Sequence, residues 1–160
     1  MPHLTIPIPP SAGRFLPLTS LTPTIYMTAL PDTLRSPLEL DPIGERVRAT
    51  WTSGDFGRIA RGYAQGSNEF IARLGLVPLE PVLDVACGTG NLAIPAARTG
   101  ASVTGVDIAP NLVSQAQTRA QAEELSISLD VGDVEQLPYA NGEFQTVVTM
   151  FGAMFAARPE

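Results

Sequence analysis

Hydrophobic and polar positions along the chain take on a regular pattern near Asp55. From residue 56 to residue 74, apolar side chains recur every three or four positions, which predicts one or two amphipathic helices. Gly62 and Gly66 are expected to interrupt this helical segment. Gly75 is expected to end it, because glycine readily adopts the left-handed conformation that closes many helices.

Beyond residue 80, short apolar segments alternate with amphipathic ones. The segments predicted as strands are 82–86, 102–106, 126–131 and 144–150. One helix is predicted after the first strand and is closed by Gly100, and a second is predicted from residue 110 to about 124. The apolar side of the second helix is formed by Leu112, Val113, Ala116 and Ala120. This order predicts an α/β fold with a parallel sheet, in which ligands bind at the carboxyl ends of the strands.

The first 41 residues follow neither period. Nine of the 15 prolines lie between Pro2 and Pro42, and proline neither donates to a strand ladder nor continues a helix. Residues 1–41 are therefore predicted to be an extended, mostly disordered arm, and residues 42–160 to form the folded part. Met27 is a second possible start, which would make the preceding residues an over-extended reading frame.

Composition and charge exclude several classes of function. The 160 residues are 44% hydrophobic, enough for one domain with a core, and their net charge is −6 with no lysine. No basic run is present, so no nucleic-acid partner is expected. Cys87 and His3 are the single residues of their kinds, which leaves no set of metal ligands, and no apolar run is long enough for a membrane span. A lone cysteine requires no oxidising compartment, so we expect a cytoplasmic protein.

A glycine-rich stretch follows the first predicted strand. Its residues G-T-G-N-L-A (88–93) match the G-x-G-x-x-[G/A] pattern of a nucleotide-binding loop, and Asp107 stands just after the second predicted strand, where it can bind ribose hydroxyls. Both features fit a dinucleotide and S-adenosylmethionine equally. Asp84, four residues before Gly88, favours S-adenosylmethionine, because a carboxylate opposes a pyrophosphate but attracts a ligand with a sulfonium and an ammonium.

Three blocks in order resemble the class I S-adenosylmethionine-dependent methyltransferases, in particular the small-molecule enzymes similar to those of ubiquinone and menaquinone biosynthesis. The blocks are V-L-D-V-A-C-G-T-G-N (82–91), V-T-G-V-D-I-A-P-N-L-V (103–113) and G-D-V-E-Q-L-P-Y-A-N-G-E-F (132–144). The resemblance runs from about residue 51 to residue 160 and implies a Rossmann-like, doubly wound parallel sheet. Because members of the family continue through further strands, the chain is interpreted as an incomplete domain, truncated after its first four strands.

The resemblance also implies which residues contact the methionine half of the cofactor. Gly88 and Gly90 would let the backbone approach this half. Asp84 would steer its ammonium, and Ala86 is included among the cofactor-binding residues.

The nucleoside half is assigned by the same resemblance. Asp107 would bind both ribose hydroxyls and Ile108 would pack on the adenine. Asp133 and the Val134 backbone would contact the adenine edge.

Four further residues near these blocks are interpreted as structural. Trp51 and Tyr63 would fit a lid over the cofactor, but aromatic residues on amphipathic helices usually belong to the core, so neither is included in the site. Asn91 is expected to cap the helix after the glycine loop first and to contact a ligand second. Cys87 is expected to be a small loop residue, because no histidine other than His3 is present to activate it.

The expected function is S-adenosylmethionine-dependent methyl transfer to a small molecule. The end of the fourth predicted strand, T-M-F-G (149–152), lacks the proline-containing motifs of nucleic-acid methylating enzymes. No catalytic residue is assigned, because methyl transfer mainly needs alignment and exclusion of water. The alternatives are a truncated, non-catalytic fragment that binds the cofactor weakly and an NAD(P)-dependent oxidoreductase. In a truncated sheet, the uncharged segment 144–150 would be an exposed edge, which predicts self-association.

Overall fold

The computed structural model describes residues 38–54, 56–156 and 158. Everything described below belongs to the unit Pro31–Glu160. The predictions of a disordered arm over residues 1–41 and of a start at Met27 fall almost wholly outside the described residues.

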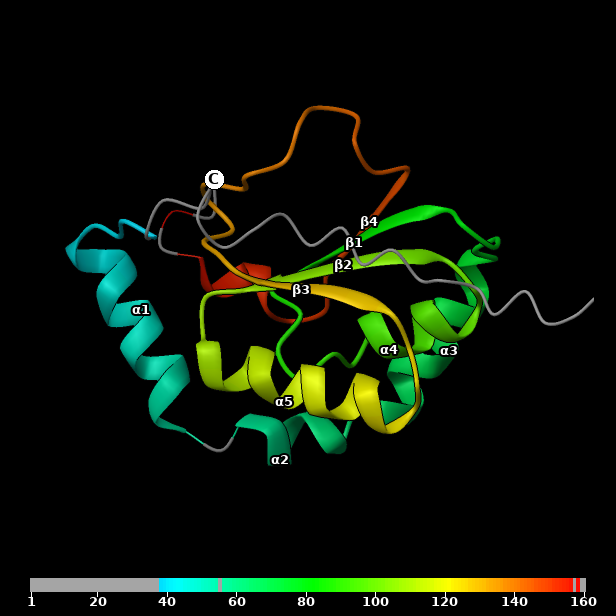
Figure 1. Ribbon diagram of the computed structural model, residues 1–160. Coiled ribbons are helices and arrows are strands. Elements are labelled where there is room, and N and C mark those ends of the chain that lie inside the picture. Colours follow the sequence, from blue (N-terminus) through cyan, green and yellow to red (C-terminus); the bar gives the residue numbers. More distant parts are fainter. Residues whose placement is uncertain (1–37, 55, 157, 159–160) are drawn as a thin grey trace, which may run out of the picture. The chain divides into compact units, whose positions relative to one another are not determined.

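Four parallel strands form a sheet at the centre of this unit (Figure 1). They are β1 (Pro81–Val85), β2 (Ser102–Asp107), β3 (Ile127–Val131) and β4 (Thr146–Val148). Their order across the sheet is β3-β2-β1-β4, and every neighbouring pair is parallel. The chain winds from β1 outward to β3 and then returns to place β4 on the other side of β1. This confirms the predicted doubly wound α/β fold.

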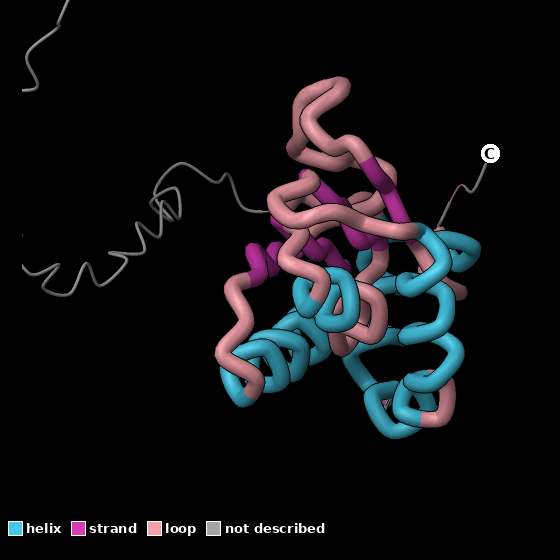
Figure 2. The backbone as a smooth tube through the Cα atoms, turned by 90° about the vertical axis from the view of Figure 1, so that its right-hand side faces the viewer, coloured by secondary structure: helices cyan, strands magenta, loops and turns pink. Residues whose placement is uncertain are grey.

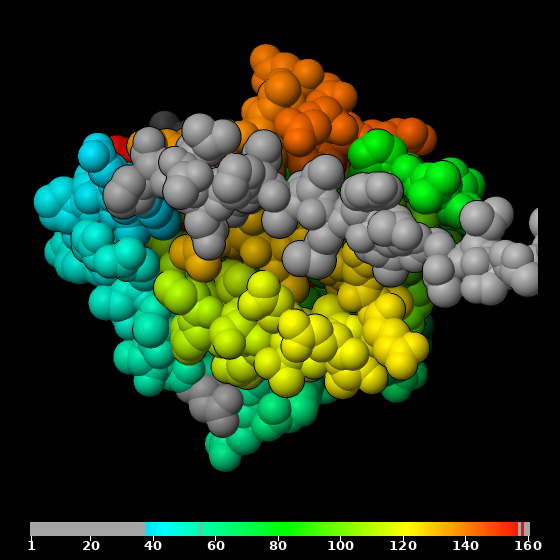
Figure 3. Space-filling view, viewed as in Figure 1, coloured from blue at the N-terminus to red at the C-terminus, as the bar shows by residue number. Residues whose placement is uncertain are grey.

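Helices cover one face of the sheet. The two that pack directly on the strands are α4 (Ala93–Arg98) and α5 (Pro110–Ala122). Three more pack on these two: α1 (Pro42–Ser53) and α2 (Phe56–Arg61) on α5, and α3 (Ala64–Leu74) on α4. Figures 1 and 2 show the helices on one side of the sheet and the segment 132–145 on the other, and this segment protrudes at the top of Figure 3.

Alternation along β1 sends side chains into two apolar clusters. Val82 is fully buried on the helical face, in a cluster with Ile71 of α3. Leu83 and Val85 point to the opposite face, where Phe144 and other residues of the segment 132–145 cover them. On the helical face, the four residues predicted for the apolar side of α5 are all buried, as expected.

Residues 42–53 form a helix that the apolar pattern did not predict. The carboxylate of Asp41 accepts hydrogen bonds from the backbone N–H groups of Ile43 and Gly44 at 3.0 and 2.8 Å, and Pro42 stands at the start of the helix. These capping contacts stabilise α1, although Gly44 is its only fully buried residue. An apolar period was therefore the wrong signal for this helix.

The predicted break at Gly62 is correct, whereas the break predicted at Gly66 is wrong. Gly62 lies between α2 and α3, and Gly66 lies inside α3. A glycine inside a helix costs only about 1 kcal/mol relative to alanine, and burial of the neighbouring Ser67 and Ile71 outweighs that cost. α3 ends at Gly75 with φ +65°, as expected.

β4 is shorter than the predicted strand 144–150. It pairs with residues 82–84 of β1, and β1 itself ends one residue later, at Val85. The chain then turns toward Ala86, against which Gly152 packs so closely that a Cβ at Gly152 would collide. This turn carries the segment 150–155 over the end of β1.

Candidate cofactor-binding site

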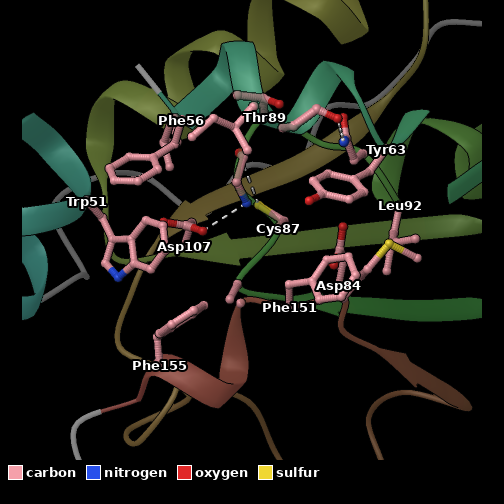
Figure 4. A pocket seen from close by; sticks show the side chains of 18 of the residues that line it. Trp51, Phe56, Tyr63, Asp84, Cys87, Thr89, Leu92, Asp107, Phe151 and Phe155 are labelled. Atoms are coloured by element: carbon pink, nitrogen blue, oxygen red, sulfur yellow. Dashed lines mark hydrogen bonds between the residues drawn. The ribbon is translucent and has the colours of Figure 1, made fainter. Parts of the chain in front are cut away.

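A cavity of about 460 Å³ opens at the carboxyl ends of β1 and β2 (Figure 4). One side is the glycine loop after β1, and the other sides come from α1 and α2, from Tyr63 just before α3, and from residues 150–155 after β4. The cavity thus lies where the winding of the chain reverses, which is the place where doubly wound sheets bind their ligands.

The glycine loop places its two glycines in different surroundings. Both have positive φ angles, +53° at Gly88 and +81° at Gly90, which favour glycine. A Cβ at Gly88 would have no atom within 4 Å, so its backbone faces open space in the cavity. A Cβ at Gly90 would lie 3.2 Å from Ile94 and 3.4 Å from Ala116. Gly88 therefore leaves room for a ligand, whereas Gly90 lets the loop pack on the helices.

Asp84 lies in β1 beneath the loop and lines the cavity with only 1% of its surface exposed. Its Oδ2 accepts a hydrogen bond from the backbone N–H of Ala93 at 2.9 Å. Burial raises the pKa of Asp84 to about 8, and the nearby Asp107 adds to the shift. The carboxyl group thus accepts a hydrogen bond from the first N–H group of α4, whose N-cap residue Leu92 makes no side-chain hydrogen bond.

Asn91 does not cap that helix, contrary to expectation. Its Nδ2 donates to the carbonyl oxygen of Ala60 in α2 at 2.6 Å, and its Oδ1 accepts from Arg119 of α5 at 3.0 Å. Asp84 already takes the N–H that a cap would bind, so the Asn91 side chain is free to join the loop to two helices.

Asp107, the last residue of β2, joins the loops that follow the first two strands. Its Oδ2 accepts from the Gly88 N–H at 2.8 Å and its Oδ1 from the Ala109 N–H at 2.9 Å (Figure 4 shows the first bond). Burial raises its pKa, against the lowering effect of these hydrogen bonds. Ile108 follows it and also lines the cavity.

Asp133 and Val134 lie beside a second, smaller cavity of about 30 Å³. Ile108 and Phe155 line both cavities, so the small cavity lies next to the large one. The Oδ1 of Asp133 accepts from the Glu135 N–H at 3.0 Å. Of the eight residues predicted for the site, five line the large cavity, two more line the small cavity alone, and Gly90 lines neither. The five are Asp84, Ala86, Gly88, Asp107 and Ile108.

Aromatic side chains form the part of the cavity that the sequence did not assign. Trp51 packs on Phe56 and on Phe155 with ring centroids 4.4 and 5.1 Å apart, and Tyr63 packs on Phe151 at 5.3 Å. Figure 4 shows the first group beside Asp107 and the second pair near Asp84. All five rings line the cavity. The sequence suggested a lid for Trp51 and Tyr63 alone, and both were left out of the predicted site because aromatic residues on amphipathic helices usually belong to the core.

Cys87 lies in the loop but is buried, and burial raises the pKa of its thiol well above the ordinary value. A thiol that resists ionisation is a poor nucleophile, which agrees with the expectation of a small loop residue. Within the described residues, no group of three or more His, Cys, Asp or Glu side chains is placed to hold a metal ion. A search of the same residues found no helix with the length and apolar character needed to cross a membrane.

Comparison with known proteins agrees with this geometry. Residues 82–160 match the family model described as a methyltransferase domain. An uncharacterized protein of Mycobacterium tuberculosis is 39% identical over 110 residues, which cover 68% of this chain and 40% of that protein. The 23S rRNA (uracil(1939)-C(5))-methyltransferase RlmD of Shewanella sp. is 39% identical over 84 residues, or 50% of this chain and 18% of that enzyme. The chain thus spans about two fifths of the length of its mycobacterial relative.

Among solved structures, the magnesium protoporphyrin IX methyltransferase ChlM from Synechocystis PCC 6803, crystallised with bound SAM, is similar with a TM-score of 0.62 and 28% identity. The match covers 75% of this chain and 66% of ChlM. The parallel sheet, the glycine loop and the family match together show that the chain belongs to the class I S-adenosylmethionine-dependent methyltransferases.

Proposed function

We propose that the large cavity binds S-adenosylmethionine and that the chain contributes this site to an enzyme that methylates a small molecule. One observation carries the proposal. Carboxyl groups from two neighbouring strands, Asp84 and Asp107, line a single cavity beside the open backbone of Gly88.

The residues around the two cavities fit the parts of this cofactor. Asp84 would face the ammonium group. Asp107 keeps acceptor capacity for the ribose hydroxyls, because a carboxylate accepts about four hydrogen bonds and two backbone donors use only part of that capacity. Ile108 would pack on the adenine, with Asp133 and Val134 near its edge.

A dinucleotide fits the same site less well. Its pyrophosphate would need free N–H groups at the start of the helix after the glycine loop. The Ala93 N–H at that position already donates to Asp84. The oxidoreductase alternative is therefore disfavoured by this contact.

In the proposed reaction, S-adenosylmethionine supplies a methyl group that its sulfonium has already activated. The chain contributes alignment and a site that excludes water. Leu92 and Leu112, both buried, join the aromatic rings in lining the cavity. No general base is assigned, because both cavity carboxyl groups serve the cofactor in this proposal.

A small molecule is proposed as the acceptor. The cavity volume of about 460 Å³ lies within the range of small-ligand sites. Among the described residues that line the cavity there is no Lys, Arg or His, whereas a nucleic-acid backbone needs cationic partners. The rRNA methyltransferase relative shares only 18% of its length with this chain, so the likeness is concentrated in one region of that enzyme.

Two further proposals concern the chain as a whole. β4 is the last strand of the described sheet on its side, and an uncharged edge of this kind favours pairing with a second chain. We propose that the chain self-associates through this edge.

The buried, unpaired Cys87 fits a reducing cytoplasm, which we propose as the compartment.

Isothermal titration calorimetry with S-adenosylhomocysteine and with NAD tests the cofactor proposal. We expect S-adenosylhomocysteine to bind and NAD not to bind. Asp107→Asn should weaken S-adenosylhomocysteine binding by about 1–3 kcal/mol, since bonds that involve a charged group are lost. Asp130→Asn is the matched control, because Asp130 is a buried strand carboxyl group outside both cavities. Tight NAD binding, or equal losses in both variants, would contradict the proposal.

A further inference from the structure

Several large apolar side chains that line the cavity are also exposed to solvent at its mouth. The most exposed of them are Ile59, Tyr63, Phe151, Met154 and Phe155, at 59%, 50%, 59%, 66% and 48%. We call these five residues the apolar mouth. They come from α2, from the residue before α3 and from the segment after β4. Exposed apolar side chains gathered at a cavity are typical of a ligand contact.

Phe151 is held in an unfavourable backbone conformation. Its φ angle is +63°, in the left-handed region that a bulky residue rarely adopts. The next residue, Gly152, packs against Ala86 with no room for a side chain, so the chain is fixed just after Phe151. Strained residues of this kind gather at ligand sites. In this conformation the ring of Phe151 packs on Tyr63 at the cavity mouth.

The charges at the cavity point to one kind of occupant. Among the described residues that line it, the side chains with an acidic group are Asp84 and Asp107, and no cationic side chain is present. A nearby cation, Arg119, donates its Nη1 to Thr89 and Asn91 of the loop. An anionic acceptor that left water for this cavity would lose its hydration and gain no cationic side chain as a partner.

We infer that the apolar mouth binds the methyl acceptor and selects an uncharged aromatic compound, whose ring lies against Phe151 and Tyr63. This inference rests on the proposed function, since the mouth lies over the proposed cofactor site. An uncharged ring stacks on the exposed faces or edges of the two side chains. An acidic analogue of the same ring is rejected at the cavity.

The test uses the full chain saturated with S-adenosylhomocysteine, and 2-naphthol and 6-hydroxynaphthalene-2-sulfonate as probes. Calorimetry should show 2-naphthol bound and the sulfonate bound at least about tenfold more weakly. Phe151→Gly should weaken 2-naphthol binding about two- to tenfold without lowering the melting temperature, because glycine suits the positive φ angle. Leu79→Gly is the matched control: Leu79 has φ +65° and is 81% exposed, but does not line the cavity.

A second pair of variants keeps the test independent of the folding of Phe151→Gly. Tyr63→Leu should weaken 2-naphthol binding, whereas Phe70→Leu, on α3 and outside the cavity lining, should not. Equal binding of the two probes, or unchanged 2-naphthol binding in Tyr63→Leu and in folded Phe151→Gly, overturns the inference while S-adenosylhomocysteine still binds. If the wild-type chain binds no S-adenosylhomocysteine, the proposed function fails first and this inference fails with it.

Discussion

The Nη1 atom of Arg119 lies 2.6 Å from the carbonyl oxygen of Thr89, so a helix cation holds the backbone of the glycine loop. The same Nη1 donates to Oδ1 of Asn91 at 3.0 Å, and Nδ2 of Asn91 donates to the carbonyl oxygen of Ala60 at 2.6 Å. Hydrogen bonds thus connect α5, the loop and α2, which supplies Phe56 to the cavity. The position of the loop and the position of this wall are therefore coupled.

Replacing Arg119 should loosen the loop. Arg119→Met keeps the apolar stem but removes its charge-assisted hydrogen bonds, which is expected to cost about 1–2 kcal/mol of unfolding free energy. S-adenosylhomocysteine should bind more weakly, since the loop would no longer be held in one conformation. Urea denaturation and calorimetry measure the two effects. Arg98→Met is the control, because Arg98 makes an exposed ion pair with Glu123, and its loss should have little effect on either quantity.

Asn91→Asp should separate the two contacts of Asn91. The carboxylate still accepts from Arg119 but no longer donates to Ala60, so only the link to α2 is lost. Trp51, the single tryptophan, packs on Phe56 of α2 and reports the change. We expect acrylamide to quench Trp51 fluorescence more strongly in this variant than in the wild type.

Asn68→Asp is the matched control for that experiment. Asn68 also donates to a backbone carbonyl, that of Ala64 in its own helix, and accepts from Arg98. Its replacement should leave Trp51 quenching unchanged. Quenching that rises equally in both variants would show a general effect of the added charge rather than a loss of the contact with α2.

Asp84 should make stability depend on pH. Its pKa is about 8 in the folded chain, against 3.8 without the fold, chiefly because it is buried. Between these values the folded chain binds more protons than the unfolded chain, so the free energy of unfolding should fall as pH rises from about 4 to about 8. Asp84→Asn cannot ionise and should show a smaller fall. Urea denaturation at pH 5, 7 and 9 compares the two. Identical slopes would mean that Asp84 ionises freely in the folded chain.

Cofactor binding should also depend on pH, in the direction opposite to that of stability. An ammonium beside Asp84 favours the ionised carboxylate, so binding of S-adenosylhomocysteine should release a proton near neutral pH. The affinity of the wild type should rise between pH 6 and pH 8, and that of Asp84→Asn should stay nearly constant. Calorimetry in buffers with different ionisation enthalpies measures the proton release directly. Release that persists in Asp84→Asn would assign it to another group.

Self-association through β4 should respond to a charge on that strand. Val147 is 61% exposed in β4, and lysine on an edge strand opposes pairing with another chain. Val147→Lys is expected to shift sedimentation profiles toward the monomer. Val131→Lys, on β3 at the opposite side of the described sheet, should leave them unchanged. A wild-type chain that stays monomeric at high concentration would contradict the proposed association.

The strands, α5 and the main cofactor-loop features could be predicted because they depend on local patterns. Buried strands appear in the sequence as short apolar runs, and the apolar residues of α5 recur with the helical period. Gly88 and Asp107 follow strands that end at one edge of a parallel sheet, so their proximity followed from topology. α1 was not predicted because its apolar pattern is weak. The capping contacts at Asp41 stabilise this helix instead.

The sequence by itself determined the fold class, the place of the glycine loop and the two acidic residues beside it. Only the tertiary structure decided which groups share the cavity. Trp51 and Tyr63 precede the glycine loop and Phe151 follows β4, yet all three line one cavity, because α1 and α2 pack on α5 and the chain after β4 turns toward Ala86. It also decided that Asp84 bonds to Ala93 and resists ionisation. Burial and long-range packing depend on the whole folded chain, and no local pattern of residues encodes them.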